Sequence, residues 1–187
     1  MLQKVYNMKI WIVLALLKSE HHVRGLARLL YTNQTHIARK LQELSKENIV
    51  DFNQEGRNKV FFLKKTLEAK QYVYSAEMQK LIDTIKKYPS LRRVIEFIKR
   101  NEKINIAILF GSYAKGIAHK ESDIDVYIDT INVRIKKEIE LIDSKINIKI
   151  GKYNKDSLLI KEIDKNHVII KGVESYYEKN KFFDETS

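Results

Sequence analysis

Two apolar stretches, joined by a glycine-serine corner and a short polar segment, constrain the fold of this chain more than any other feature. The run 106–110 ends abruptly at Gly111 and Ser112, which is typical of a buried strand that stops at a turn. The following segment 122–129 reads SDIDVYID, and its polar and apolar residues alternate. Strand side chains repeat every two residues, so this alternation predicts a second strand with one polar and one buried face.

The polar face of that second strand carries two acids, Asp123 and Asp125. Two carboxylates on one face repel each other unless a divalent cation lies between them, and hard cations such as Mg²⁺ share carboxylate oxygens with substrate phosphates. Gly111 allows the backbone to approach phosphates because it lacks a Cβ, and Ser112 offers a hydroxyl and an N–H group. These features predict a site for Mg²⁺ (or Mn²⁺) and a triphosphate.

The same residues resemble a known signature. The combination of Gly111-Ser112, Gly116 and SDID at 122–125 is similar to that of the polymerase-β-like nucleotidyltransferases, in particular the minimal nucleotidyltransferases of prokaryotes. The resemblance implies transfer of a nucleoside monophosphate from an NTP, with ATP as the first expectation, to an acceptor hydroxyl. It implies catalytic and metal-binding roles for Asp123 and Asp125, and nucleotide-binding roles for Gly111, Ser112 and Ser122. An ordinary strand–turn–strand with solvated acids is the alternative.

The resemblance also implies a third carboxylate on the next strand, where it helps to activate the attacking hydroxyl. The expected strand is INIKI at 146–150, and its polar face offers Asn147 and Lys149 but no acid. Asn147 is a poor general base, and Lys149 repels a metal ion. Two hypotheses therefore stay open: a metal-dependent nucleotidyltransferase, and a DNA-binding transcriptional regulator whose transferase-like domain binds nucleotide without catalysis.

Positive charge is concentrated in the first part of the chain. The formal net charge is +11, of which segment 1–65 contributes +7, segment 66–100 contributes +4 and segment 101–187 contributes nothing. Such asymmetry indicates an anionic polymer as partner, with a general solubilising excess as the alternative. The chain has no Cys, which excludes disulfides and thiolate metal sites. No apolar run approaches the roughly 18 residues of a membrane span, so we expect a cytoplasmic protein without a membrane partner.

The basic N-terminal segment has the pattern of a helix-turn-helix. Apolar spacing predicts helices at 4–18, 23–30 and 33–46, the last capped by Thr32. Polar and basic residues lie at the start of the third helix, away from its apolar seam, as in helix-turn-helix proteins. Two β-type runs, near 49–52 and 59–63, then flank a glycine-containing turn and predict a hairpin.

A helix-turn-helix followed by a hairpin resembles the winged-helix DNA-binding domains. The resemblance implies major-groove contacts from the start of the third helix, and phosphate or minor-groove contacts from the hairpin tip. The residues at these two places are Gln34, Thr35, His36, Arg39, Arg57 and Lys59. Winged helices also serve as protein–protein modules, so that alternative stays open.

The predicted architecture is α+β in three parts. These are an N-terminal winged helix-turn-helix at 1–65, a helical linker at 66–100, and a C-terminal nucleotidyltransferase-like mixed sheet with flanking helices at 101–183. The long charged helix expected near 66–87 either connects the domains or forms a homodimer seam. Minimal nucleotidyltransferases often act beside a small helical partner protein, so such a partner joins NTP and DNA among the expectations.

Overall fold

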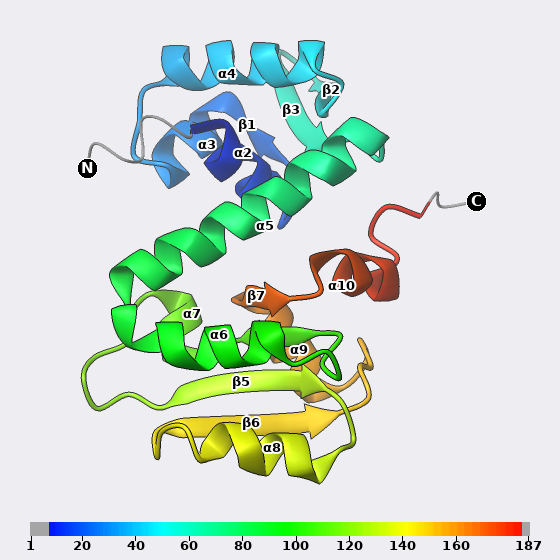
Figure 1. The fold of residues 1–187 in the computed structure, drawn as a ribbon. Helices are drawn as coiled ribbons and strands as arrows, with labels where there is room; N and C mark the ends of the chain where they lie inside the picture. Colours follow the sequence, from blue (N-terminus) through cyan, green and yellow to red (C-terminus); the bar gives the residue numbers. More distant parts are fainter. Residues whose placement is uncertain (1–7, 185–187) are drawn as a thin grey trace. The chain divides into compact units, whose positions relative to one another are not determined.

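The chain forms two compact units. A computed structural model describes residues 8–184, and the units are Met1–Ala76 with Phe183–Ser187, and Glu77–Phe182. Helices and two separate sheets occur in the described residues, which confirms the predicted α+β class (Figure 1).

The first unit packs helices around a three-stranded antiparallel sheet of order β1-β3-β2. Its elements are α2 (Met8–Leu16), β1 (His21–His22), α3 (Val23–Leu29), α4 (Gln34–Lys46), β2 (Val50–Glu55) and β3 (Asn58–Leu63). Each of the three helices contributes completely buried side chains to the core: Ile12, Val13, Leu26, Ile37, Leu41 and Leu44. The sequence predicts the first helix from residue 4, and residues 4–7 lie outside the described part of the chain.

The N-cap of α4 differs from the prediction. Asn33 has an extended backbone, and its side-chain oxygen accepts a hydrogen bond of 2.7 Å from the backbone N–H of His36. Asn33 immediately precedes the first helical residue, and from there a short side chain reaches the third N–H of the helix. The expected cap, Thr32, lies one residue too early for this bond.

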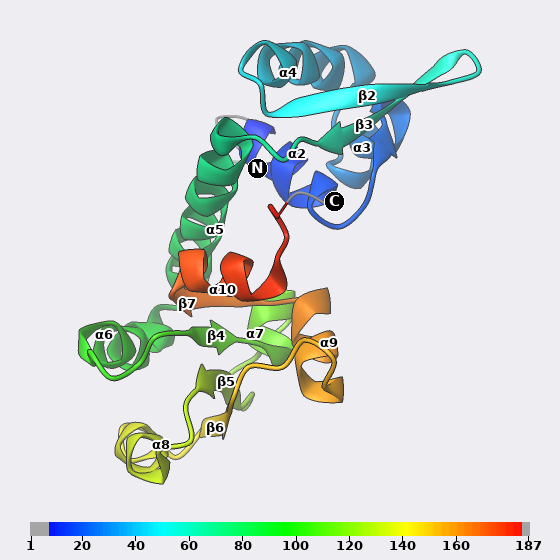
Figure 2. The same ribbon diagram turned by 90° about the vertical axis from the view of Figure 1, so that its right-hand side faces the viewer.

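The predicted hairpin of the first unit is present and longer than its two sequence runs. Glu55 pairs with Asn58, which leaves Gly56 and Arg57 as a two-residue turn. Gly56 has a φ of 58°, a left-handed conformation that a tight hairpin turn requires and that glycine adopts without steric cost. Figure 2 shows the tip of this hairpin extending past the helices of the unit.

The division between the two units falls inside the long helix α5 (Leu67–Lys87). The residue before α5 is bonded within the first unit, since the Thr66 hydroxyl donates to the Asn48 carbonyl at 2.6 Å. Later in the helix, Leu81 belongs to the apolar core of the second unit, and Ile85 packs against that core. The sequence places boundaries at residues 65 and 100, whereas tertiary contacts divide the chain between Ala76 and Glu77.

The second unit contains a four-stranded mixed sheet of order β6-β5-β4-β7. After α5 its elements are η1 (Pro89–Leu91), α6 (Arg92–Arg100), β4 (Ala107–Leu109), α7 (Gly111–Lys115), β5 (Ile124–Asp129), α8 (Val133–Glu140), β6 (Ile146–Gly151), α9 (Leu158–Lys165), β7 (Val168–Lys171) and α10 (Val173–Asn180). The central strand β4 pairs antiparallel with β5 and β7, and β5 pairs parallel with β6. Helix α8 supplies the crossover that two parallel neighbours need.

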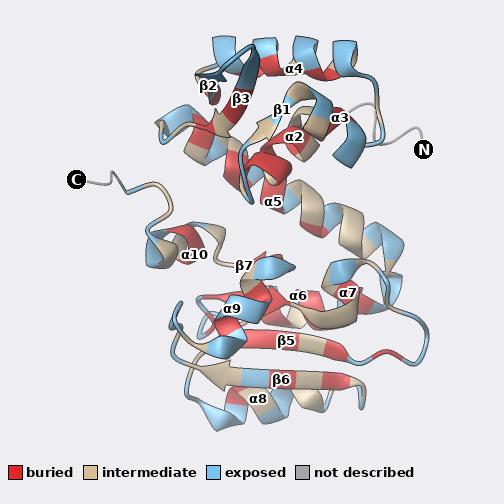
Figure 3. Cartoon of the chain, turned by 180° about the vertical axis from the view of Figure 1, so that it is seen from behind, coloured by how far each residue is buried: buried red, intermediate tan, exposed pale blue. Residues whose placement is uncertain are grey.

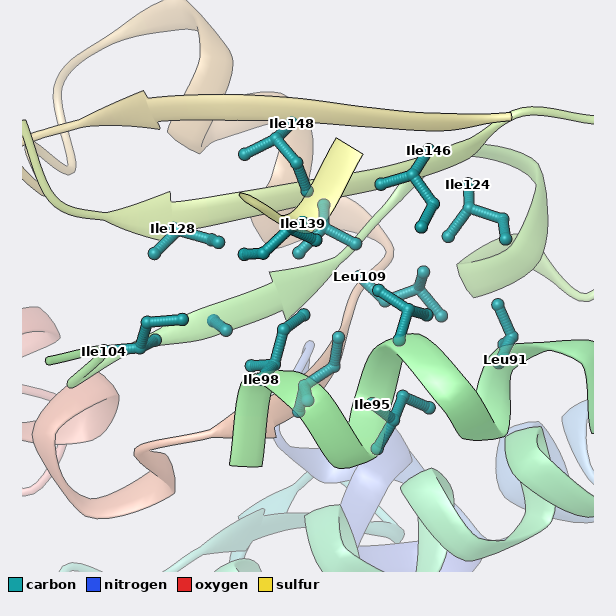
Figure 4. Packing of buried hydrophobic residues seen from close by; sticks show 14 of the residues in the cluster. Leu91, Ile95, Ile98, Ile104, Leu109, Ile124, Ile128, Ile139, Ile146 and Ile148 are labelled. Atoms are coloured by element: carbon teal, nitrogen blue, oxygen red, sulfur yellow. The ribbon is translucent and has the colours of Figure 1, made fainter. Parts of the chain in front are cut away.

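One face of this sheet forms the main core of the unit. Helices α6 and α8 contribute to that core, and β5 and β6 turn alternate isoleucine and valine side chains into it (Figure 4). The prediction that Ile124, Val126 and Ile128 point into a core is confirmed. Because strand side chains alternate, the polar residues of β5 and β6 lie on the opposite face. Figure 3 shows β5 and β6 from that side.

Candidate functional site

The end of β4 and the start of β5 lie side by side where these two inner strands meet the same end of the sheet. Leu109 pairs with Val126, and the backbone N–H of Phe110 donates to the carbonyl of Asp125 at 3.0 Å. This register places the Gly111 corner directly against the Asp125 side chain. The predicted proximity of the glycine-serine corner to one of the two acids is therefore a property of the fold.

Gly111 fits this corner for a reason that its sequence alone does not show. A Cβ added at Gly111 would overlap Oδ2 of Asp125 and lie 3.3 Å from its Cγ. Gly111 also has a φ of 68°, which side-chain-bearing residues rarely adopt. The glycine therefore makes room for the Asp125 carboxylate, in addition to the predicted close approach of phosphates.

Asp123 precedes β5 by one residue and is exposed. Its side chain forms no hydrogen bond or ion pair with any residue in the described range 8–184. Asp125, by contrast, is half-buried and bonded. The two acids thus differ: one carboxylate is held by the fold, and the other is free to reach a ligand.

Asn147 is the side chain that the fold bonds to Asp125. The parallel register pairs Asp125 with Asn147, and the Asn147 amide Nδ2 donates to Asp125 Oδ1 at 2.8 Å. The polar face of β6 therefore adjoins the acids, as its alternation predicts. The sequence gives no sign of the bond itself, since the residue is not acidic and the pairing depends on strand register.

The predicted nucleotide-binding serines have different surroundings. The Ser112 hydroxyl forms no hydrogen bond within the described residues, so it is available to a ligand. Ser122 is buried, and its Oγ accepts a hydrogen bond of 3.0 Å from the backbone N–H of His119. This bond stabilises the loop that leads into β5. The contact of Ser122 with nucleotide stays a prediction.

The donor set at this corner suits a single hard cation. Asp123 and Asp125 offer carboxylate oxygens, and two carboxylates with substrate phosphates and water make an ordinary Mg²⁺ environment. Within residues 8–184 no group of three or more His, Cys, Asp and Glu side chains is placed to hold a metal ion. The residues present therefore fit one cation shared with a triphosphate.

Tyrosines with raised pKa values belong to a cluster in the second unit. This cluster comprises Tyr127, Tyr153, Tyr176 and Tyr177, whose rings form successive edge-to-face contacts with centroids 6.4, 5.8 and 5.2 Å apart. Burial raises the pKa of Tyr153 to about 12, and burial followed by the charge of Asp129 raises the pKa of Tyr127. These hydroxyls stay protonated at neutral pH, so they act as hydrogen-bond donors and not as general bases.

The predicted DNA contacts all belong to the first unit. On α4, Gln34, Thr35 and Arg39 are exposed, whereas His36 is half-buried. The Nε2 atom of His36 is buried and has no hydrogen-bond partner among the described residues. Nδ1 of His36 lies 3.3 Å from an Arg39 guanidinium nitrogen. His36 therefore contacts Arg39, and its contact with DNA bases stays a prediction.

The hairpin of the first unit carries the other two candidates. Arg57 occupies the exposed turn, and Lys59 is exposed on β3. The Lys59 ammonium lies 3.9 Å from the centroid of the Phe52 ring on β2. This cation–π contact holds the Lys59 ammonium over the Phe52 ring.

Comparison with known proteins bears on the second unit. No curated protein sequence matches the chain. In the described residues, no helix is both long and apolar enough to cross a bilayer. The segment from α6 to the start of α10, which contains the Gly111 corner, Asp123, Asp125 and Asn147, is covered by a family match. Over residues 92–175 this chain is similar to the family described as Polymerase beta, Nucleotidyltransferase.

Proposed function

We propose that the second unit is a metal-dependent nucleotidyltransferase that transfers a nucleoside monophosphate from an NTP, with ATP favoured, to an acceptor hydroxyl. The observation that carries this proposal is the packing of the Asp125 carboxylate against the Gly111 corner. The family match over residues 92–175 supports the same reaction class. Asp123 and Asp125 would hold Mg²⁺ or Mn²⁺, and Gly111 and Ser112 would hold phosphates.

The proposed reaction is an in-line displacement at phosphorus. The acceptor hydroxyl oxygen forms a bond to the α-phosphorus, and the bond between that phosphorus and the α,β-bridging oxygen breaks. Pyrophosphate leaves with the electron pair of the broken bond, and the hydroxyl proton passes to solvent. A divalent cation held by Asp123 and Asp125 would neutralise negative charge on the phosphate oxygens. The chain's own task is to hold and orient the triphosphate between the Ser112 hydroxyl and the two acids.

Labelled nucleotides test this proposal directly. ATP, GTP, CTP and UTP are each incubated with Mg²⁺ or Mn²⁺ and with wild-type protein, Asp123→Asn or Asp125→Asn. Loss of both nucleotide binding and pyrophosphate release in both variants is expected. The matched control is Asp156→Asn, which removes an exposed acid elsewhere in the same unit. Unchanged nucleotide binding in both site variants would contradict the proposal.

A second function for the same site is nucleotide sensing without transfer. It is favoured by Asn147, which occupies the β6 position beside Asp125 and carries no carboxylate to activate a hydroxyl. Metal-dependent binding of a triphosphate with no pyrophosphate release, in the presence of cell extract as acceptor source, would support this function over transfer. Asp125→Asn would abolish that binding in either case.

For the first unit we propose a winged-helix fold that binds DNA. Supporting this is the order helix, strand, helix, helix, hairpin, in which α3 and α4 are followed by the β2–β3 hairpin. The exposed start of α4 carries Gln34 and Thr35, whose side chains can bond base edges. Arg57 and Lys59 on the hairpin would contact phosphates or the minor groove.

Salt dependence tests the DNA proposal. Binding of the full chain to duplex DNA should weaken steeply between low and moderate salt, because each neutralised phosphate releases counterions. The double change Arg57→Ala with Lys59→Ala should remove this binding. Lys137→Ala with Lys161→Ala removes two exposed charges from the second unit and should leave it unchanged. Absent or salt-independent binding would contradict DNA recognition by this unit.

A further inference from the structure

Strand β6 presents a second polar side chain on the face that carries Asp125. The register pairs Asp125 with Asn147 and Tyr127 with Lys149, and alternate residues of a strand share a face. Ile146 and Ile148, which alternate with Asn147 and Lys149 in sequence, belong to the core on the other side. Lys149 therefore lies on the same face of β6 as Asn147, and its pair in β5 is one face position further along the strand than Asp125.

In the described part of the chain the ammonium of Lys149 has no partner, in contrast to those of Lys145 and Lys179. It is exposed and forms no hydrogen bond or ion pair with any residue between 8 and 184. Lys145, at the start of the same strand region, donates to the Lys120 carbonyl at 2.7 Å and pairs with Glu121. Lys179 is paired with Asp129. Lys149 thus offers an exposed ammonium that has no partner among the described residues and can bind an anion.

The position of Lys149 brings it within reach of a ligand at Asp125. Residues two apart in a strand are separated by roughly 6.6 Å, and adjacent strands by about 4.8 Å. A lysine has a flexible four-carbon stem, so its ammonium can extend along β6 toward Asn147. Gly111 and Ser112 lie on the β4 side of Asp125, while Asn147 and Lys149 belong to β6 on its other side.

The charges of the site indicate what Lys149 binds. Asp123 and Asp125 supply two negative charges, and the amide of Asn147 supplies none. A third carboxylate at Asn147 would allow a second cation to bind on the β6 side, whereas an amide followed by an ammonium opposes one. We propose that Lys149 binds a phosphate oxygen of the nucleoside triphosphate on the β6 side, where its ammonium takes the place of a second metal ion. This inference rests on the proposed nucleotide site at Asp125.

Nucleotide affinity tests the contact without requiring an acceptor. The probe is an ATP analogue whose α,β-bridging oxygen is a methylene group, titrated calorimetrically in the presence of Mg²⁺. Lys149→Gln should weaken binding about tenfold, which is the loss expected when a charge-assisted hydrogen bond is removed. Lys149→Arg should restore part of the affinity. The control Lys137→Gln removes another exposed charge, from α8, which packs on the opposite face of the sheet.

The number of bound metal ions tests whether the Lys149 ammonium takes the place of a second metal ion. With protein in excess over the same analogue, Mn²⁺ paramagnetic resonance should count one ion per bound nucleotide in the wild type. The double variant Asn147→Asp with Lys149→Gln should bind two, because it restores the acid and removes the opposing ammonium. Two ions per nucleotide in the wild-type protein would overturn the replacement.

These outcomes separate this inference from the function on which it rests. If Lys149→Gln binds the analogue as tightly as wild type while Asp125→Asn does not bind it, the Lys149 contact is wrong and the nucleotide site stands. If Asp123→Asn and Asp125→Asn also bind as wild type, the nucleotide site itself is wrong. If Lys149→Gln and the Lys137→Gln control lose the same affinity for the analogue, the loss reflects overall charge. The proposed contact between Lys149 and phosphate would then be wrong.

Discussion

The side-chain amide of Asn147 donates a 2.8 Å hydrogen bond to Oδ1 of Asp125, across the parallel pair β5 and β6. A carboxylate only accepts hydrogen bonds, so the amide nitrogen must face it and the amide oxygen must face away. The bond orients one acid of the candidate site before any ligand arrives. The β6 side of the site carries a neutral amide at Asn147 and an ammonium at Lys149.

Replacing this amide with a second carboxylate should destabilise the ligand-free protein. Asn147→Asp removes a donor from Asp125 and places two acids side by side, which we expect to cost about 1–3 kcal/mol near neutral pH. Thermal unfolding measures the effect, and Mg²⁺ with nucleotide should offset it. The control Asn132→Asp changes the N-cap of α8, where both residue types cap well. Equal stability of the two variants would show that the bond contributes little.

Adding a methyl group at Gly111 should disturb Asp125 more than the backbone strain alone explains. Gly111→Ala places a Cβ into the space of the Asp125 carboxylate and also forces a φ of 68° on alanine. We expect a loss of about 2–4 kcal/mol in unfolding free energy together with loss of nucleotide binding. Gly116→Ala has a similar φ of 74° but meets only the flexible end of Lys87, at 3.4 Å. Denaturant titrations of the two variants should therefore differ, and equal losses would argue against crowding at Asp125.

The hydroxyl of Tyr176 should contribute more stability than that of Tyr153. Tyr176 donates to Asp164 Oδ1 at 2.6 Å, whereas Tyr153 donates to the neutral Asn180 amide oxygen at 2.8 Å. Hydrogen bonds to charged groups contribute about 1.5–3 kcal/mol and neutral ones about 0.5–1.5 kcal/mol. Urea unfolding of Tyr176→Phe and Tyr153→Phe compares them within one cluster. A larger loss for Tyr153→Phe would contradict the assignment.

Acid should destabilise the second unit through His167. Burial lowers the pKa of His167 to about 4 from its ordinary 6.5, with the Lys80 charge as the next cause and Glu77 opposing it. The unfolded chain binds this proton more tightly than the folded one. Stability from the neutral ring is therefore complete above about pH 6.5 and lost as the pH falls toward about 4, at about 1.4 kcal/mol per unit.

Unfolding at two pH values isolates that contribution. Between about pH 7 and about pH 5 the wild type should lose roughly 2 kcal/mol more than His167→Gln, which has no proton to gain. Asp164, whose pKa burial raises, acts in the opposite direction, and it is present in both proteins. Parallel losses in the two proteins would exclude His167 as the source.

Local periodicity in the sequence predicted most of the elements and the faces they present. The alternation from 122 to 129 sent Ile124, Val126 and Ile128 into the core, as the structure confirms. The glycine in the hairpin turn and the apolar seam of α4 are local signals of the same kind. Such signals work because a residue's neighbours in sequence determine whether it can lie on a helix or strand face.

Other features depended on residues that are distant in sequence. The bond between Asn147 and Asp125, the crowding of Asp125 by Gly111, and the division of the chain inside α5 each arise from register or packing between separate elements. The sequence alone determined that two acids would follow a glycine-serine corner on a strand with one polar face. Only the tertiary structure decided which side chains meet those acids, because strand order and register are set by how the whole sheet buries its apolar face.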